Sequence, residues 1–333
     1  MRARLLCWCL LVGFAVAMLV VSVRAEESSG PLRAGIIGLD TSHVIAFTKR
    51  INDPKATGDL ADVTVVAGYP GGSPDVEASA GRVGGYTEQL RGMGLEICDS
   101  IDELLTKVDV VLLESVDGRP HLEQVRPVLA AGKRVFIDKP FAGSLADALE
   151  IVRLSKEHNT PFFSSSSTRF SSGFQAVRKE TSEFGEVKNC VASSPMSIEP
   201  HHPDLFWYGV HGVEILYTIM GPGCETVTRA EQNKVVGVWK GGRRGTFVGS
   251  SEYGATVEGT KASGSAGKYE GYAPLVAEIC KFFKTGKPPV DPEETLELFA
   301  FMEAADESKR QGGASVTIEE VMEKARKANA ARK

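Results

Sequence analysis

The sequence predicts two domains. The first, residues 32–165, is an α/β domain with a doubly wound parallel sheet, and the second, residues 166–333, is an α+β domain with an open antiparallel sheet. Up to about residue 165, short apolar runs alternate with amphipathic stretches, as expected where each strand of a parallel sheet is followed by a helix. Beyond residue 166 the apolar runs alternate with polar residues, which is typical of antiparallel strands with one solvated face. A chain of 333 residues can bury two cores.

The first domain is expected to alternate strands and helices along its whole length. Strands are predicted at 34–37, 63–67, 108–113, 134–138 and 161–165, with helices at 43–51, 101–107, 120–131 and 144–158. The run 108–113 is wholly apolar, which indicates a strand buried on both faces. Gly132 follows the third of these helices, where a left-handed residue commonly ends a helix. The glycine-rich segment 68–94 is expected to be a long excursion with one short helix.

The second domain is expected to combine short strands with three helices. The strands are predicted at 187–193, 226–228, 235–239, 244–250 and 255–258, and the helices at 209–220, 272–284 and 293–311. Asp291-Pro292 and Gly312-Gly313 are start and stop signals for the last of these helices, which we expect to pack back toward the first domain. The tail from Thr317 is interpreted as a short, solvated surface helix.

Residues 1–25 have the pattern of an export signal. Arg2 and Arg4 precede the apolar run 5–23, and Val23-Arg24-Ala25 offers small residues for cleavage before Glu26. The alternative is an uncleaved anchor, since the apolar run nearly suffices to span a bilayer. Residues 26–31 are a polar linker. The sequence therefore predicts an exported chain, periplasmic or extracellular.

Charge and cysteine content restrict the partners. Removal of residues 1–25 changes the formal charge from −5 to −8, and no basic cluster remains. Nucleic acid and anionic membranes are thus not expected as partners of the mature chain. The mature chain keeps four cysteines without any Cys-x-x-Cys pair, so we interpret them as small buried residues: Cys98, Cys190, Cys224 and Cys280.

A glycine turn follows the first predicted strand. The run Gly35-Ile-Ile-Gly38 enters a turn in which a Rossmann fold has Gly-x-Gly-x-x-Gly, but Asp40 and His43 stand in place of the second and third glycines. We expect Thr41 and Ser42 to donate to a pyrophosphate, with Asp40 turned toward the helix start and His43 adding positive charge. The alternative is a turn that no longer binds a dinucleotide.

A lysine ends another buried strand. Lys139 follows Asp138 and precedes Pro140, at the edge where ligands bind parallel sheets. A lysine there can hold a substrate hydroxyl and stabilise charge on its oxygen, whereas the alternative interpretation is a surface lysine before a turn. The end of the second strand, 67–72, contains neither an acid for the adenosine ribose nor an arginine for a 2′-phosphate, so neither NAD nor NADP is favoured.

Four stretches in this order resemble the glucose–fructose oxidoreductase, inositol dehydrogenase and MocA family. They are Gly35-Ile-Ile-Gly38, Ala131-Gly-Lys-Arg-Val-Phe-Ile-Asp-Lys-Pro140, Gly209-Val-His-Gly-Val-Glu-Ile-Leu-Tyr-Thr-Ile-Met-Gly221 and Thr285-Gly-Lys-Pro-Pro-Val290. The second is similar to the family's Glu-Lys-Pro motif with Asp138 for Glu, and the third to its His-x-x-Asp helix with Glu214 for Asp. The resemblance implies a Rossmann domain, a nicotinamide cofactor, a sugar- or cyclitol-like substrate and pairing of subunits through the open sheet.

The resemblance also implies the site residues. Lys139, His211 and Glu214 are the expected catalytic residues, with His211 taking the hydroxyl proton and Glu214 orienting it or binding a hydroxyl. The expected cofactor-binding residues are Gly35, Gly38, Asp40, Thr41, Ser42, His43, Ser115, His121 and Lys139. Trp207 stands where the family often has an aspartate, for which Asp204 or Tyr208 are the alternatives.

The sequence leaves three hypotheses of function. The first is an exported NAD(P)-dependent oxidoreductase acting on a hydroxyl carbon, with a tightly bound cofactor because free nucleotide is scarce outside the cytoplasm. The second is a binding module that keeps the fold without redox activity, and the third a lyase or glycosidase that uses the cofactor only transiently. His201 and His202 are adjacent and point to opposite sides of an extended chain, so we expect no metal site there.

Overall fold

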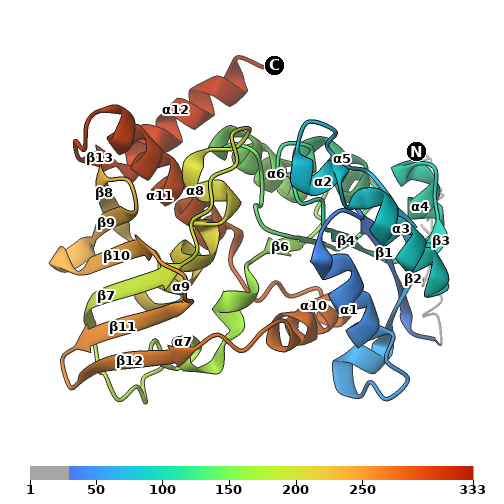
Figure 1. Cartoon of the computed structure of the whole chain (residues 1–333), viewed down its shortest axis with the longest axis horizontal. Helices are drawn as coiled ribbons and strands as arrows, with labels where there is room; N and C mark the ends of the chain where they lie inside the picture. Colours follow the sequence, from blue (N-terminus) through green and yellow to red (C-terminus); the bar gives the residue numbers. More distant parts are fainter. Residues whose placement is uncertain (1–29, 333) are drawn as a thin grey trace, which may run out of the picture.

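The computed structural model describes residues 30–332, in which two sheets with their helices lie side by side (Figure 1). The predicted leader 1–25 and most of the linker lie outside the described residues. Among the described residues, no helix combines the length and apolarity needed to cross a membrane. The four cysteines of the described chain are free and buried.

The first sheet is wholly parallel, with the strand order β3-β2-β1-β4-β5-β6. Its strands are β1 (Leu32–Ile37), β2 (Val63–Tyr69), β3 (Glu96–Ile97), β4 (Val110–Leu113), β5 (Val135–Ile137) and β6 (Phe162–Ser164). This order reverses direction between β1 and β4, where the carboxyl ends of the strands open the crevice that binds ligands in such folds. The predicted doubly wound sheet is confirmed.

Helices cover both faces of this sheet. They are α1 (Ser42–Ile51), α2 (Glu77–Ala80), α3 (Val83–Gly92), α4 (Ile101–Lys107), α5 (His121–Ala130) and α6 (Leu145–Glu157). Phe47 of α1 and Leu90 of α3 belong to the core on one face, and Leu104 of α4 and Val125 of α5 to the core on the other. The prediction of one short helix in 68–94 was wrong, because this segment contains both α2 and α3. Helix α3 forms despite its glycines, since it buries Leu90.

The second sheet is mixed, with the order β12-β11-β7-β10-β9-β8-β13. Its strands are β7 (Val187–Ser194), β8 (Cys224–Glu231), β9 (Lys234–Trp239), β10 (Arg244–Gly249), β11 (Gly254–Gly259), β12 (Ser263–Lys268) and β13 (Val316–Thr317). Neighbours pair antiparallel as predicted, except β7 and β10, which pair parallel. Strand β12 was missed because Ala266 is its one buried apolar residue.

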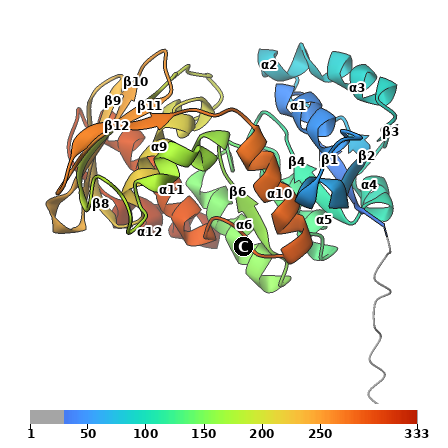
Figure 2. The same ribbon diagram turned by 90° about the horizontal axis from the view of Figure 1, so that it is seen from below.

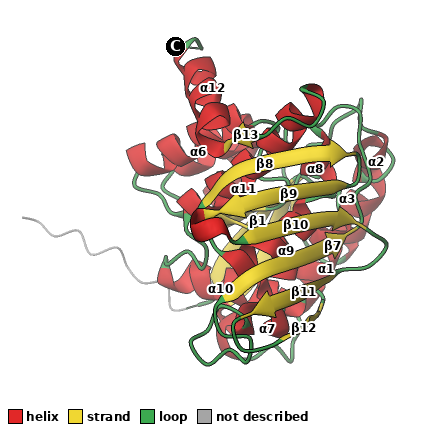
Figure 3. Cartoon of the chain, turned by 90° about the vertical axis from the view of Figure 1, so that its left-hand side faces the viewer, coloured by secondary structure: helices red, strands yellow, loops and turns green. Residues whose placement is uncertain are grey.

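The helices of the second half are α7 (Ser172–Ala176), α8 (Asp204–Trp207), α9 (Val210–Met220), α10 (Ala273–Thr285), α11 (Pro292–Arg310) and α12 (Ile318–Ala330). Every side chain of α9 is buried, and the helix packs on β7 and β10. Gly212 permits this close approach, since a Cβ there would lie 2.3 Å from the Phe247 ring. No helix of residues 30–332 lies in front of the sheet's other face (Figure 3). There Val191 is 42% exposed, and pairing of subunits through this face stays a prediction.

Two late helices return to the first domain. Helix α10 shares a core with α1 and the parallel sheet, and Figure 2 shows it beside that sheet. Helix α11 contacts both β8 and α6. Helix α12 begins with a capping box of Thr317 and Glu320 and packs on α6 through Val321 and Ala325. The interpretation of this tail as a solvated surface feature was therefore wrong, because one of its faces is apolar.

Candidate active site

A cavity of about 480 Å³ lies where the first sheet faces the second domain. The start of α1 contributes Thr41, Ser42 and His43, and the end of β5 contributes Lys139. The second domain contributes His211 of α9 and a set of aromatic and hydroxyl side chains. The remaining lining residues are Ala78, Arg82, Val116, Ser167, Thr168, Ser197, Trp207, Tyr208, Tyr253, Tyr269 and Tyr272.

The turn after β1 keeps its first glycine for steric reasons. Gly38 has a φ of +85°, and a Cβ there would lie 2.2 Å from Oγ of Ser115. Gly35 packs against Leu104, with which a Cβ would collide at 2.8 Å. Thr41 caps α1 by accepting a hydrogen bond from the backbone N–H of His43 at 3.4 Å. Gly38 thus shapes the turn and Gly35 lets β1 pack on α4, and neither residue lines the cavity.

Asp40 is fully buried and turns away from the helix start. Its Oδ1 accepts a hydrogen bond from the Val116 backbone N–H at 2.9 Å, and its Oδ2 accepts one from the Ser79 hydroxyl at 2.5 Å. Burial raises the pKa of this carboxyl, although the bond from Ser79 opposes the rise. The expectation that Asp40 caps the helix was wrong, because Thr41 already fills that role and partners after β2 and β4 hold Asp40.

His43 and Asp138 form a buried pair at the wall of the cavity. Nδ1 of His43 lies 2.7 Å from Oδ2 of Asp138, and the imidazole stacks on Phe47. Burial alone would raise the pKa of Asp138, but the charge and hydrogen bond of His43 hold it below its ordinary value. Asp138, the residue that replaces the family's glutamate, thereby orients an imidazole that replaces a glycine.

Lys139 reaches the cavity as a nearly buried cation. Its exposure is 8%, and its Nζ lies 5.9 Å from the centre of the Tyr208 ring. In the described part of the chain it makes no ion pair. A buried ammonium without a carboxylate partner is costly, so its site favours a ligand group that carries or develops negative charge.

His211 faces the same cavity from α9. Its Nδ1 lies 2.7 Å from the hydroxyl of Ser166, whose oxygen also accepts from the Thr168 backbone N–H at 3.2 Å. Burial, followed by the charge of Lys139, holds the pKa of His211 well below its ordinary value. The imidazole is therefore neutral at neutral pH and able to accept a proton.

Glu214 lies behind His211 and outside the cavity lining. It pairs with the buried guanidinium of Arg169 and accepts from the Ser166 backbone N–H at 3.2 Å. Arg169 also pairs with Glu294 at 2.7 Å. The structure thus places Glu214 as a positioning residue for the Ser166–His211 contact.

The other predicted residues lie around the loop after β4. Nε2 of His121 lies 2.9 Å from the Ser115 carbonyl oxygen, and its Nδ1 lies 3.2 Å from that of Phe141. The Ser115 hydroxyl donates to Gln124 at 2.8 Å. His121 and Ser115 therefore join the loops after β4 and β5 and do not line the cavity.

Sequence reasoning missed most of the aromatic wall. Tyr253, Tyr269 and Tyr272 come from loops of the second domain, and no motif marked them in advance. Of the two alternatives for the family's aspartate, Tyr208 lines the cavity. Asp204 instead pairs with Arg229 at 3.1 Å.

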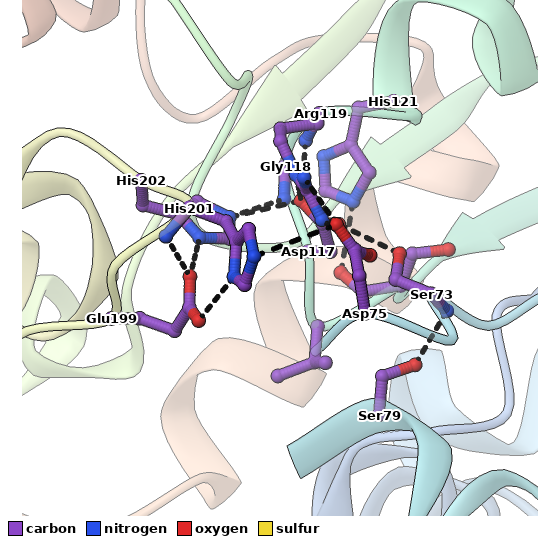
Figure 4. Close-up of polar contacts among 12 residues, drawn as sticks. Ser73, Asp75, Ser79, Asp117, Gly118, Arg119, His121, Glu199, His201 and His202 are labelled. Atoms are coloured by element: carbon purple, nitrogen blue, oxygen red, sulfur yellow. Dashed lines mark hydrogen bonds and ion pairs between the residues drawn. The ribbon is translucent and has the colours of Figure 1, made fainter. Parts of the chain in front are cut away.

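A polar network joins three loops next to the cavity (Figure 4). Asp117, which follows β4, accepts from the Ser73 hydroxyl at 2.6 Å and from Nη2 of Arg119 at 2.7 Å. Nε2 of His202 lies 2.9 Å from Asp117, and Nδ1 of His202 lies 2.8 Å from Glu199. Burial would raise the pKa of Asp117, but hydrogen bonds from His202, Arg119 and Ser73 hold it well below its ordinary value. Among residues 30–332, no group of three or more ligating side chains is placed to hold a metal ion.

Glu114, at the end of β4, is a buried acid without a hydrogen-bond partner among the described residues. Burial, followed by the charge of Asp138, raises its pKa well above the ordinary value. An acid whose pKa is raised on folding contributes stability that is fully present below its unfolded pKa and is lost as the pH rises.

Between about pH 5 and about pH 8 we therefore expect the free energy of unfolding to fall less for Glu114→Gln than for the wild type. The difference should be about 1.4 kcal/mol for each pH unit of this interval that lies below the raised pKa of Glu114. Urea unfolding at the two pH values measures this difference. Glu123→Gln, at an exposed site of α5, is the control. Equal pH dependence of Glu114→Gln and wild type would contradict the assignment of a neutral Glu114.

Residues 33–165 match the model of the oxidoreductase family with an NAD-binding Rossmann fold, Gfo/Idh/MocA. An uncharacterized oxidoreductase of Streptococcus pneumoniae is 27% identical over 157 residues, which are 42% of each chain. Inositol 2-dehydrogenase 3 of Saccharopolyspora erythraea is 27% identical over 179 residues, 52% of this chain and 47% of the relative. The chain thus spans less than half the length of the curated relatives it matches.

A solved scyllo-inositol dehydrogenase of Lactobacillus casei, with bound NAD(H) and scyllo-inositol, has the same fold. It superposes with a TM-score of 0.69 at 13% identity, over 86% of this chain and 99% of that one. The first domain thus matches the oxidoreductase family with an NAD-binding Rossmann fold, and the whole chain shares the fold of solved dehydrogenases.

Proposed function

We propose that this protein is an enzyme that acts at a hydroxyl-bearing carbon of a small polyhydroxylated molecule held in the cavity. The observation that carries the proposal is the meeting of Lys139 and His211, from different domains, in one cavity. Neutral His211 accepts the hydroxyl proton, while Lys139 stabilises the negative charge that develops on the oxygen. Ser166 fixes the imidazole through Nδ1, which leaves Nε2 for the substrate.

Two candidate functions fit this site. The first is oxidoreduction of the carbon with NAD or NADP, which the family match of residues 33–165 and the inositol dehydrogenase relative support. When bound, the nicotinamide would supply the hydride acceptor. The second is a carbohydrate- or ligand-binding module that keeps the fold without redox activity, and buried Asp40 favours it. Asp40 fills the place where a glycine would let a pyrophosphate approach, so the steps assigned to Lys139 and His211 concern the hydroxyl proton alone.

The test is a conversion screen. The mature protein is incubated with cyclitols, sugars and sugar acids, with and without added NAD or NADP, and the products are followed by NMR. We expect wild type to convert at least one compound, and His211→Asn and Lys139→Ala to convert none of it. Conversion by both variants at the wild-type rate would exclude the proposed pair. The same screen tells the two candidate functions apart, because nucleotide-dependent conversion supports oxidoreduction and conversion of no compound supports the binding module.

We also propose that the protein is exported and that the mature chain begins at or near Glu26. The support is the charged start, the apolar run 5–23 and the small residues before Glu26. Amino-terminal sequencing of protein recovered from the periplasm or the medium is expected to read from that region. Recovery of an intact Met1 in a membrane fraction would support the anchor instead. In an exported enzyme, any nucleotide would have to be held tightly or loaded before export.

A further inference from the structure

Asp40 occupies space that a dinucleotide needs. In a nucleotide-binding turn the second glycine has no side chain, so that the pyrophosphate can approach the backbone. In this chain a carboxylate fills that position, bonded to Val116 and to Ser79. Val116 belongs to the segment after β4 and Ser79 to α2, so Asp40 joins two segments that lie on opposite sides of the turn. A buried carboxylate also repels a pyrophosphate at close range.

The network of Figure 4 closes the crevice farther out. The adenosine half of a dinucleotide would lie between the ends of β2 and β4, beside the switch point of the sheet. The Ser73 hydroxyl crosses this gap to Asp117, and the two guanidinium nitrogens of Arg119 bind the two oxygens of Asp75, each at 2.9 Å. Beside them Val76, Val116 and Trp207 form a small apolar cluster of their own.

The second domain also contributes to the network that closes the crevice. His202 pairs with Asp117 from the other side and is itself paired with Glu199, and both His202 and Asp117 are almost fully buried. Three segments from two domains therefore meet where adenosine would lie. All of their charged groups are paired with one another, so the closure is satisfied internally and does not await a ligand.

What remains open carries cationic groups and no acidic ones. Lys139 and, at the rim, Arg82 line the cavity, whereas none of the described residues lining it is an aspartate or glutamate. Lys139 is more than nine-tenths buried and has no ion-pair partner in residues 30–332. An anionic ligand group would supply the missing counter-charge in a site shielded from water.

The rest of the lining suits a hydroxylated body. Hydroxyl groups of Ser42, Ser167 and Thr168 line the cavity, and aromatic rings form its wall. Such rings offer apolar faces to the C–H groups of a small molecule, with hydroxyls as polar handles. A volume of about 480 Å³ is in the range of sites for single small ligands.

We propose that the cavity binds a compact hydroxylated carboxylate, a sugar acid in size and chemistry, and that Asp40 with the Ser73–Asp117–Arg119 bridge excludes a dinucleotide. Lys139 faces the carboxylate and its neighbouring hydroxyl, and His211 faces that hydroxyl. The inference rests on the proposed function, since it names the substrate class of the same site. It also favours binding without redox activity, the second candidate function, for this chain.

Binding measurements on the mature chain test the proposal. Calorimetric titrations use D-gluconate, D-glucuronate, myo-inositol, NAD and NADP, and native mass spectrometry examines the purified protein for retained nucleotide. We expect one of the two acids to bind at least about tenfold more tightly than myo-inositol, and no nucleotide to bind or to be retained. Lys139→Gln should weaken acid binding about tenfold or more and weaken the binding of myo-inositol by a smaller factor.

A double variant tests whether Asp40 and the Ser73–Asp117 contact exclude a dinucleotide. Asp40→Gly combined with Ser73→Ala opens the turn and cuts one bridge, and is expected to gain measurable NAD binding. Asp53→Gly, at an exposed loop site, is the matched control and should gain none. The wild-type titrations decide the question even if the double variant does not fold.

The outcomes separate the two proposals. Retained nucleotide, or micromolar binding of NAD or NADP by the wild type, overturns the exclusion and leaves the proposed function standing. Binding of myo-inositol as tightly as the acids overturns the carboxylate preference alone. Absence of binding by all three small molecules, or acid binding that Lys139→Gln leaves unchanged, overturns the proposed function as well.

Discussion

Replacement of Lys139 by alanine is expected to abolish turnover of the substrate and leave the fold intact. The ammonium stabilises negative charge on the reacting oxygen chiefly in the transition state, so its loss should lower kcat by about a hundredfold or more. Folding should not suffer, because Lys139 makes no ion pair within the described chain and its removal takes away a cation that is costly to bury.

Three measurements check this expectation. Steady-state kinetics with a compound that wild type converts give kcat and KM, and thermal unfolding gives Tm. Lys49→Ala, an exposed lysine in the last turn of α1, is the control and should behave as wild type in both. Activity of Lys139→Ala near the wild-type level would remove this residue from the mechanism. A large fall in Tm would show that Lys139 supports the fold.

The sequence was sufficient to predict the architecture, because the spacing of apolar residues along the chain shows which residues of each strand and helix are buried. The apolar run 108–113 became β4, and the amphipathic stretch 144–158 became α6. Elements that depend on distant partners were less visible. Strand β13 exists because Val316 and Thr317 pair with β8, far away in sequence, and strand β12 because of its pairing with β11.

Those residues of the candidate site that directly follow a predicted strand or lie on a predicted helix could be predicted from the sequence. Lys139 stands directly after a buried strand, and His211 on a largely apolar helix, so both could be named in advance and both line the cavity. Asp40 could not be placed from local rules. An aspartate at a helix start is ordinarily a cap. Its actual partners, Ser79 and Val116, lie 39 and 76 residues away.

The same limit applies to Glu214. Its spacing from His211 suggested a shared helical face and thus a shared role. The structure instead gives Glu214 a buried partner from η2 (Ser167–Phe170), Arg169, which no periodicity connects to it. Residues in a common motif can therefore divide into one that meets the ligand and one that holds the first in place.

Glu214→Ala is expected to destabilise the protein strongly, in contrast to Lys139→Ala. Removal of one member of a buried ion pair leaves its partner charged and unpaired, which typically costs about 3–5 kcal/mol. Here Arg169 keeps Glu294 at 2.7 Å, so we expect the lower end of that range, about 3 kcal/mol. The Ser166 backbone N–H also loses its acceptor, and with it the contact that holds His211.

Urea unfolding measures the loss of stability, and nuclear magnetic resonance titration of His211 follows its protonation. Glu214→Gln is the matched variant, because the amide keeps an acceptor for the Ser166 N–H and roughly the same volume. It should lose less stability than Glu214→Ala and keep the depressed pKa of His211, which burial and the charge of Lys139 produce. If Glu214→Ala unfolds at the wild-type urea concentration yet lacks activity, Glu214 acts on the substrate and the positioning role is wrong. If Glu214 is a positioning residue, the free energy of unfolding of Glu214→Ala falls strongly. Its turnover then falls only to the extent that His211 is displaced.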